Sequence, residues 1–417
     1  KQQNLPTLVL HIACFLLKKE RKTKQKNGSI VFRRIINIAA REVDQLVHTP
    51  IYLFCMVIFP IIILIFFTSL MSSGQPEKMP CGVVDNDNSA VTRTLIRRLD
   101  AFQSTKVVAH YTNVNEARRA IQQGKIYAYL YIPEGTTAKL VSGRQPTVSF
   151  YYSNVTLVAG SLLFKDLKTI TTLGSAAIGS AKLQMLGKTN REIKTTLQPI
   201  ALDVHTIGNP WLSYNIYLST IMVPGVFMLF MLLITVYSIG TELKFGRSKE
   251  WMQMAGKNIF IALSGKLLPQ FLVFFSMFLC YEWYVYGHLN FPHPGGISKM
   301  LLIALLTVTA AQGFGVFVFG LMPSLRMSMS VCSLWAVVGF SACGATFPLF
   351  AMDSPIIALA QLIPLRHYYM VYQIAVFNGY PLINAWPHVV ALVAFAALPL
   401  LTARNIRRAM LEYVYIP

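Results

Sequence analysis

A charged stretch between two long apolar runs carries the side chains best placed for charge pairing. Residues 241–257 read TELKFGRSKEWMQMAGK, with two acids and four cations. Gly246 interrupts the helix, and SKEWMQMA then predicts a short helix with Ser248 at its N-cap and Glu250 in its first turn. Such a helix could pair with charges of a soluble partner, and the residues leave open the alternative of a plain solvated turn.

Two other groupings of reactive side chains lack the spacing that their chemistry requires. Gly187–Thr189 reads Gly-Lys-Thr, but Lys182 stands where a phosphate-binding loop needs its first glycine. Asp85, Asn86 and Asp87 lack the glycine and distal glutamate of a calcium loop, which favours a turn at a strand end. We therefore predict neither nucleotide hydrolysis nor a metal site in this chain.

The cysteines and histidines show no catalytic pattern either. The six cysteines have no CxxC or Cys/His spacing, and four of them lie in predicted spans. Cys81 is the one cysteine of the large polar insertion, so no disulfide can form within that insertion. Asp353 and His367 come nearest to a catalytic grouping, and we interpret both as helix-end or interfacial residues.

Composition sets the class of protein that must position these residues. The chain has 417 residues, of which 54% are hydrophobic and 13% charged. Soluble proteins are about a quarter charged, so this is an integral membrane protein. The net charge of +20 is concentrated beside apolar runs, with ten Lys/Arg against three acids in the first fifty residues. That distribution indicates membrane topology and anionic lipid, and not a nucleic-acid partner.

Two segments precede the first span. Residues 1–29 form a basic segment, cytoplasmic or interfacial. We leave open whether its short apolar run is an anchor that lies on the membrane surface or an irregular beginning of the sequence without a structural role. Residues 30–49 predict an amphipathic helix in the membrane interface, ended by Pro50. Its apolar stripe is Phe32, Ile35, Ala39, Val43 and Leu46, opposite Arg34, Asn37, Arg41 and Asp44.

Six apolar runs are long enough to cross a membrane as helices. The first, residues 51–71, is followed by a polar insertion over 72–209, and residues 210–417 hold spans two to six. In the insertion, CGVVDNDNS, KIYAYLYIP and PTVSFYYS predict strands, and VNEARRAIQQG predicts a helix that begins near Asn113 or Asn115. Alternating strands and helices indicate a small α/β domain with a long helical return to the membrane.

The segment 350–384 is apolar but interrupted by prolines and charges. Such a segment suits a helix that enters the membrane and returns, buried against protein. Lys and Arg flank the spans so that both termini and the loop 241–257 are cytoplasmic and residues 72–209 lie outside. The predicted fold is a mainly α-helical membrane protein with six spans, an interfacial helix, a re-entrant segment and an extracytoplasmic α/β domain.

In this order the elements resemble type-2 ABC exporter permeases with a large outer domain between the first two spans. CGVVDNDNS resembles the first outer strand of that family, GTELKFGRSKEW its coupling loop, SGKLLPQ the start of its third span, and GATFP with LIPLRHYY the stretch after the fifth. The resemblance covers about residues 30–410. Met352-Asp353 replaces a frequent Met-Pro, and Arg247 interrupts a common Gly-Thr pair, which weakens the transfer of individual roles.

The resemblance implies a half-transporter that is not itself an enzyme. Two permeases, identical or related, would form a dimer on separate ABC ATPase subunits, which bind the ATP and Mg that this chain does not hold. A lipophilic or amphipathic substrate, such as a drug or lipid, would be exported from the cytoplasm or inner leaflet of the bacterial inner membrane. Membrane lipids, a periplasmic membrane-fusion protein and an outer-membrane channel are further partners that the resemblance suggests, and nucleic acid is not.

The resemblance also assigns residues to two sites. Coupling to the ATPase falls to Glu242, Lys244, Gly246, Arg247, Ser248, Lys249, Glu250, Arg33, Arg34 and Arg41. A gate on the extracytoplasmic side of the re-entrant segment falls to Phe347, Pro348, Pro364 and Arg366.

Two rival functions predict features that are weak or missing in this sequence. An ion-coupled secondary transporter usually shows internal repeats and intramembrane acids, whereas no repeat is found and Glu282 is the one candidate acid. A membrane receptor would use the outer domain as a sensor, but it should also carry a cytoplasmic output domain.

Overall fold

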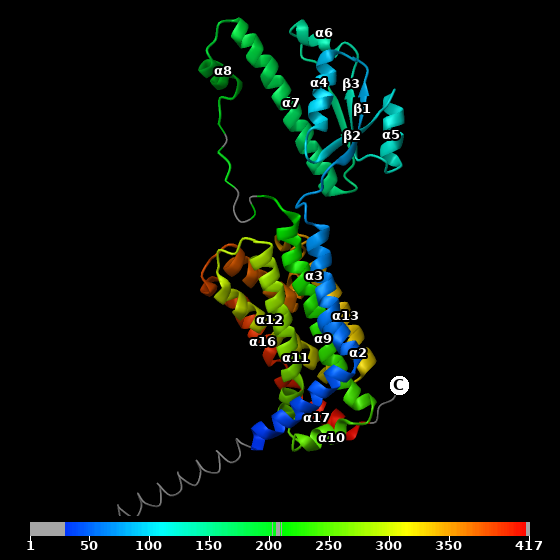
Figure 1. Cartoon of the computed structure of the whole chain (residues 1–417), viewed down its shortest axis with the longest axis vertical. Coiled ribbons are helices and arrows are strands. Elements are labelled where there is room, and N and C mark those ends of the chain that lie inside the picture. The colour runs from blue at the N-terminus through cyan, green and yellow to red at the C-terminus, as the bar shows by residue number, and fades with distance from the viewer. Residues whose placement is uncertain (1–29, 202, 206–208, 210, 414–417) are drawn as a thin grey trace, which may run out of the picture. The chain divides into compact units, whose positions relative to one another are not determined.

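A computed structural model describes residues 30–201, 203–205, 209 and 211–413, and the expectation for residues 1–29 lies outside this part. The chain divides into two compact units. One unit contains the long apolar helices. The other consists of Ser73–Thr206 with Trp211–Ser213. Each unit is described by itself (Figure 1).

The described residues of the helical unit include six helices long and apolar enough to cross a membrane, as predicted. They are Pro50–Leu70 (α2, Pro50–Leu53; η1, Phe54–Ile58; α3, Phe59–Leu70), Asn215–Lys244 (η2, Asn215–Ser219; α9, Thr220–Lys244), Ile259–His288 (α11, Ile259–Glu282; η3, Trp283–His288), Ile297–Leu321 (α12), Leu325–Ala342 (α13) and Leu382–Glu412 (η6, Leu382–Ala385; α16, Trp386–Ala397; α17, Pro399–Glu412). The sequence predicts the fifth span over Met329–Leu349, whereas the helix begins at Leu325 and ends at Ala342. Gly344 adopts a φ of +93° soon after this end.

Two of these helices form the centre of the bundle. In the most apolar window of the second span 72% of the residues are buried, and in that of the fourth 67%, against 28% for the first and fifth and 22% for the sixth. α12 packs against both α9 and α16. At Gly313 of α12 a side chain would collide with the backbone of α16 at Phe395, so glycine is required for this close approach. The peripheral helices therefore expose apolar faces suited to lipid or to a second membrane protein.

Short helices fill the predicted re-entrant segment. They are η4 (Leu349–Ala351), α14 (Ser354–Ala360), α15 (Pro364–Val371) and η5 (Tyr372–Phe377). Of these, α15 packs against α16, α12 and α13, and its first residues are buried. Pro364 is tolerated there because the first turn of a helix needs no backbone donor.

Residues 30–48 are helical and are called the N-terminal helix below. Part of the predicted apolar stripe is exposed, with Phe32 at 65% and Val43 at 48%. The face that packs on protein instead contains Ile38 and Glu42, both buried. Ile38 lies against Gly265 of α11, where a side chain would clash with it.

The second unit is a four-stranded sheet with helices on both faces. The strand order is β2-β1-β3-β4, in which β1 pairs in parallel with β2 and β3, and β4 is antiparallel to β3. The strands are β1 (Met79–Asp85), β2 (Thr105–His110), β3 (Ala128–Ile132) and β4 (Ser149–Tyr152), and the helices are α4 (Ala90–Asp100), α5 (Val114–Gln122), α6 (Thr136–Val141), α7 (Leu157–Met185) and α8 (Asn190–Leu197). α4 and α7 cover one face and α5 the other, as Figure 1 shows.

Turn chemistry fixes the ends of these elements. Ser89 caps α4 in a capping box with Thr92. The Thr137 hydroxyl donates to the Asp87 carboxylate and holds the pKa of this carboxyl below its usual range. The acidic run after β1 is thus engaged in turn and cap contacts, in agreement with the interpretation as a strand-end turn. Burial raises the pKa of the Cys81 thiol to about 12, so this thiol is unreactive.

The structure also shows which of the two asparagines begins α5. The Asn113 side chain accepts a hydrogen bond of 2.9 Å from the backbone N–H of Glu116 and is the N-cap, whereas Asn115 lies inside the helix. We predict that Asn113→Ala destabilises α5 by about 1 kcal/mol, which is a roughly fivefold faster hydrogen exchange of its amides. Asn115→Ala is the matched control and should not speed exchange, because alanine is the better helix former inside α5. Equal effects of the two substitutions would contradict this cap.

Candidate coupling site

The loop after α9 is short and has one obligatory glycine. α9 ends at Lys244, and Gly246 adopts a φ of +68°, a conformation that other residues rarely adopt. α10 (Ser248–Met254) follows at once. The sequence predicts Ser248 as the N-cap, and this is wrong. The N-cap is Arg247, because Ser248 is already the first residue in helical conformation. Glu250 lies in the first turn, as predicted.

α10 has one anchored face and one charged face. Trp251 and Met252 are fully buried, and the helix contacts α9, α11 and α17, with which Figure 1 shows it at one end of the helical unit. Lys249 and Glu250 are exposed on the other face. Because the buried face fixes the helix, the exposed charges have a defined position.

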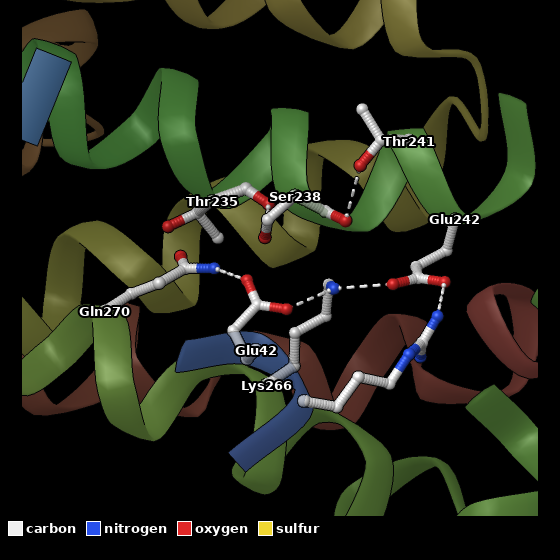
Figure 2. A network of polar contacts seen from close by, with 8 residues as sticks. Glu42, Thr235, Ser238, Thr241, Glu242, Lys266 and Gln270 are labelled. Carbon is white, nitrogen blue, oxygen red and sulfur yellow. Dashed lines mark hydrogen bonds and ion pairs between the residues drawn. The ribbon is translucent and has the colours of Figure 1, made fainter. Parts of the chain in front are cut away.

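A buried ion network lies beside this loop (Figure 2). The Lys266 ammonium of α11 donates to Glu42 Oε2 at 2.6 Å and to Glu242 Oε1 at 2.8 Å. Arg41 Nη2 donates to the second oxygen of Glu242 at 2.9 Å, and Gln270 Nε2 to the second oxygen of Glu42 at 2.7 Å. The network therefore joins the N-terminal helix, α9 and α11 through their side chains.

Charge balance makes this burial tolerable. The side chains of Lys266, Glu42 and Glu242 are 1%, 2% and 0% exposed, and that of Arg41 is 18% exposed. Two carboxylates thus face two cations, and every carboxylate oxygen of the network accepts a hydrogen bond. An uncompensated buried charge costs several kcal/mol, so the four groups depend on one another.

Further contacts tie the network to α10 and to the N-terminal helix. The Lys266 ammonium lies 5.4 Å from the centre of the Trp251 ring, a cation–π distance. The Arg34 guanidinium lies where a side chain on Gly256, after α10, would be, so the two segments are in direct contact. A displacement of α10 therefore acts on the network through two routes.

The structure separates the predicted coupling residues into two groups. Lys244, Lys249, Glu250, Arg33 and Arg34 are exposed, as contact with a soluble partner would require. Glu242 is fully buried and Arg41 is paired with it, so neither is placed to meet an outside partner in this conformation. Their position fits a role in holding the base of the loop. Of the rest, Gly246 is exposed, Arg247 half-buried and Ser248 buried.

Sequence reasoning missed Glu42, Lys266 and Gln270. A lysine and a glutamine four residues apart interrupt the apolar run of α11 in SGKLLPQ, and they share one helix face. That spacing was a usable signal of a buried polar partner. Glu42 gave no such signal, because it stands among the polar residues of an amphipathic pattern.

The predicted gate residues lie apart from this site in two settings. Phe347 and Pro348 are exposed in the loop after α13, whereas Pro364 and Arg366 are buried at the start of α15. Arg366 Nη1 donates to the carbonyl of Cys343 at 2.9 Å and so ties α15 to the end of α13. Within the described residues no group of three or more His, Cys, Asp or Glu side chains is arranged to hold a metal ion.

The fold and this loop define a class of protein, namely a multi-pass membrane protein with a rigid charged helix between its second and third spans. A family model for ABC-2 family transporter proteins matches residues 50–404, and the chain belongs to that family. It is therefore an ABC transporter permease, the membrane-spanning kind of subunit. The chain is also similar to the linearmycin resistance permease protein LnrN of Bacillus subtilis (strain 168), with 19% identity over 352 residues, which are 80% of this chain and 88% of that protein.

The ion network yields a charge-balance prediction. Lys266→Met would leave two carboxylates buried against one cation, and we expect a loss of about 3–5 kcal/mol in stability. The measurement is the temperature at which the detergent-purified protein loses its monodisperse peak. The double variant Lys266→Met with Glu42→Gln restores the balance and should recover most of the loss. Lys257→Met, at an exposed site, is the control, and a loss in the double variant as large as in the single one would refute this balance.

Proposed function

We propose that this chain is the permease subunit of an ATP-driven exporter that moves a lipophilic or amphipathic substrate out of the cytoplasm or inner leaflet. Separate ATPase subunits would bind ATP and Mg and dock on the α10 end of the bundle. In this proposal the α10 loop and both termini are cytoplasmic and the α/β unit is extracytoplasmic. The cations around the loop support that orientation, because Lys and Arg favour the cytoplasmic side of a membrane.

The observation that carries the proposal is that one face of α10 is buried in the bundle while the opposite face exposes charges. A partner that pushes on Lys249 and Glu250 moves a helix whose other face, through Trp251 and Met252, is packed into the bundle. A flexible loop would move by itself when a partner pushes on it, whereas an anchored helix transmits the displacement to the helices on which it packs. This is the property that coupling to a soluble motor requires.

The ion network is the proposed relay from α10 to the spans. Alternation between two states needs an element with two arrangements that the partner stabilises differently. Beside the network, four buried polar atoms lack hydrogen-bond partners within the described structure: Thr235 Oγ1, Gln270 Oε1, Arg247 Nε and Trp251 Nε1. Buried polar groups usually have partners, so we infer that these atoms gain them in the other state.

Substrate class and assembly are supported by apolar surface. A small apolar cavity of about 10 Å³ lies between α9, α13 and the start of α15, lined by Gly225, Met228, Leu232, Trp335, Gly339 and Leu365. It is too small for a substrate in this conformation, whereas the exposed apolar faces of the first, fifth and sixth spans suit lipid or a second permease copy. The similarity to a permease named for linearmycin resistance supports a role in moving a compound that is harmful to the cell.

The outer unit is the proposed contact for an extracytoplasmic adaptor such as a membrane-fusion protein, leading to an outer-membrane channel. Between residues 72 and 209 it carries sixteen Lys/Arg against nine Asp/Glu, which favours an acidic partner. The far part of α7, from Thr171 to Met185, contains no fully buried residue. α8 packs on part of this stretch, with Leu197 against Gly179, and the rest of its surface is available to a partner.

The deciding experiment is purification of the tagged chain in mild detergent, followed by an ATPase assay of what accompanies it. A co-purifying ATPase subunit whose activity depends on the permease supports the exporter. Repeated recovery of the chain without any nucleotide-hydrolysing partner would contradict the exporter proposal and favour a secondary transporter or a receptor.

Charge reversal on α10 tests the docking face. We predict that Glu250→Lys lowers the coupled ATPase activity roughly fivefold, the equivalent of about 1 kcal/mol at the interface. The thermal stability of the chain should not change, because this side chain is exposed. Glu134→Lys in the outer unit, also exposed, is the matched control. Unaltered coupling in the Glu250→Lys protein would remove α10 as the docking element.

A further inference from the structure

Two histidines meet where the segment after the fifth span packs against the sixth span. His367 of α15 and His388 of α16 place their Nδ1 atoms 3.0 Å apart, a hydrogen-bond distance. The His367 ring is also packed 5.8 Å from the Phe395 ring, and its residue is only 4% exposed. This contact joins two elements that are separated by the turn through η5 and η6.

The remaining partner of His367 fixes where the protons lie. His367 Nε2 is 2.9 Å from the carbonyl oxygen of Gln361, and a carbonyl can only accept. Nε2 therefore carries a hydrogen. In the neutral ring Nδ1 is then the acceptor, so His388 must donate from its own Nδ1. The neutral pair has one arrangement that satisfies every contact.

The charged group that acts on this pair is a cation, Arg366. Arg366, the residue before His367 on α15, acts on both rings, and its guanidinium donates to the carbonyl of Cys343. The elements in contact with α15 are α9, α11, α12, α13, α16, η5 and η6, and the charged residues of the helices among them are Lys299, Arg326, Glu242, Lys244, Lys266 and Glu282. Lys299 is directed to the carbonyl of Tyr380, and Glu242 is already held by Lys266 and Arg41. Glu282 acts on Tyr368 and on neither histidine, so within the described residues no carboxylate is paired with the two rings.

We propose that His367 and His388 form a proton-binding latch, which fastens α15 to α16 when neutral and releases it when both rings are protonated. A first proton can be accommodated, because His388 can change tautomer and accept from His367 or keep donating to it. A second proton leaves two N–H groups facing each other across 3.0 Å, on two positive rings beside Arg366. No tautomer then satisfies the contact, and like charges repel.

Besides the latch, two hydrogen bonds hold the start of α15 to α13 and to the loop that follows α13. Arg366 ties the start of α15 to Cys343, and Trp335 Nε1 of α13 donates to the carbonyl of Leu362 at 3.2 Å. Release from α16 therefore frees one side of α15 while the side toward α13 remains held. Acid on the face of the membrane that this segment reaches would loosen it there without unfolding the bundle.

Hydrogen exchange of the full-length, detergent-purified chain tests the latch without any ATPase partner. We expect the protection of the α15 amides, corrected for intrinsic exchange, to fall roughly fivefold or more between pH 7.5 and pH 4.5, a change that corresponds to the loss of one hydrogen bond. The amides of α9 should keep their protection over the same range. Failure of the exporter proposal would leave this result unaffected.

Two variants at one position separate the latch from general acid effects. His388→Asn places an amide at the Nδ1 position that can donate or accept and cannot titrate, so α15 should stay protected at both pH values. His388→Leu removes the contact, so α15 should exchange fast at both. An unchanged wild type at pH 4.5, an acid response in His388→Asn equal to that of the wild type, or full protection in His388→Leu would each overturn the proposal.

Discussion

The need to neutralise Lys266 inside the bundle is the constraint on which the rest of this structure depends. A lysine in a membrane-type helix is costly unless it is paired, and here it takes two carboxylates from two other elements. Glu42 comes from the N-terminal helix and Glu242 from the end of α9, so satisfying one cation determines where both must lie. Arg41 then balances the second carboxylate and closes the set. The packing of three helices is thus tied to one ammonium group.

This arrangement explains why the charged loop has a defined position. The last turn of α9 is fixed by Glu242, and α10 follows after a glycine turn and is held by Trp251 against the same lysine. Outward-facing charges on α10 are therefore rigidly connected to the interior. The proposed docking of an ATPase subunit on α10 would require such a connection to the interior.

The extent of the sequence prediction follows from the range of each interaction. The long apolar helices, α10 and the Asn113–Gly124 helix were predicted, because hydrophobic runs, caps and glycines act locally. The strand order β2-β1-β3-β4 was not, because pairing depends on contacts between distant segments. Glu242 was assigned to the surface, since neighbouring residues do not reveal which side of a helix end is covered. Glu42 and Lys266 are 224 residues apart, and their pairing became visible only in the folded chain.

The order of the network residues along the chain has a consequence for biogenesis. Glu42 and Glu242 both precede Lys266, so during synthesis the two acids emerge first. When α11 is inserted, the N-terminal helix and the end of α9 are already available to receive its cation. The cation of α11 is therefore made after both of its counter-ions, and it can be neutralised as soon as its helix packs against theirs.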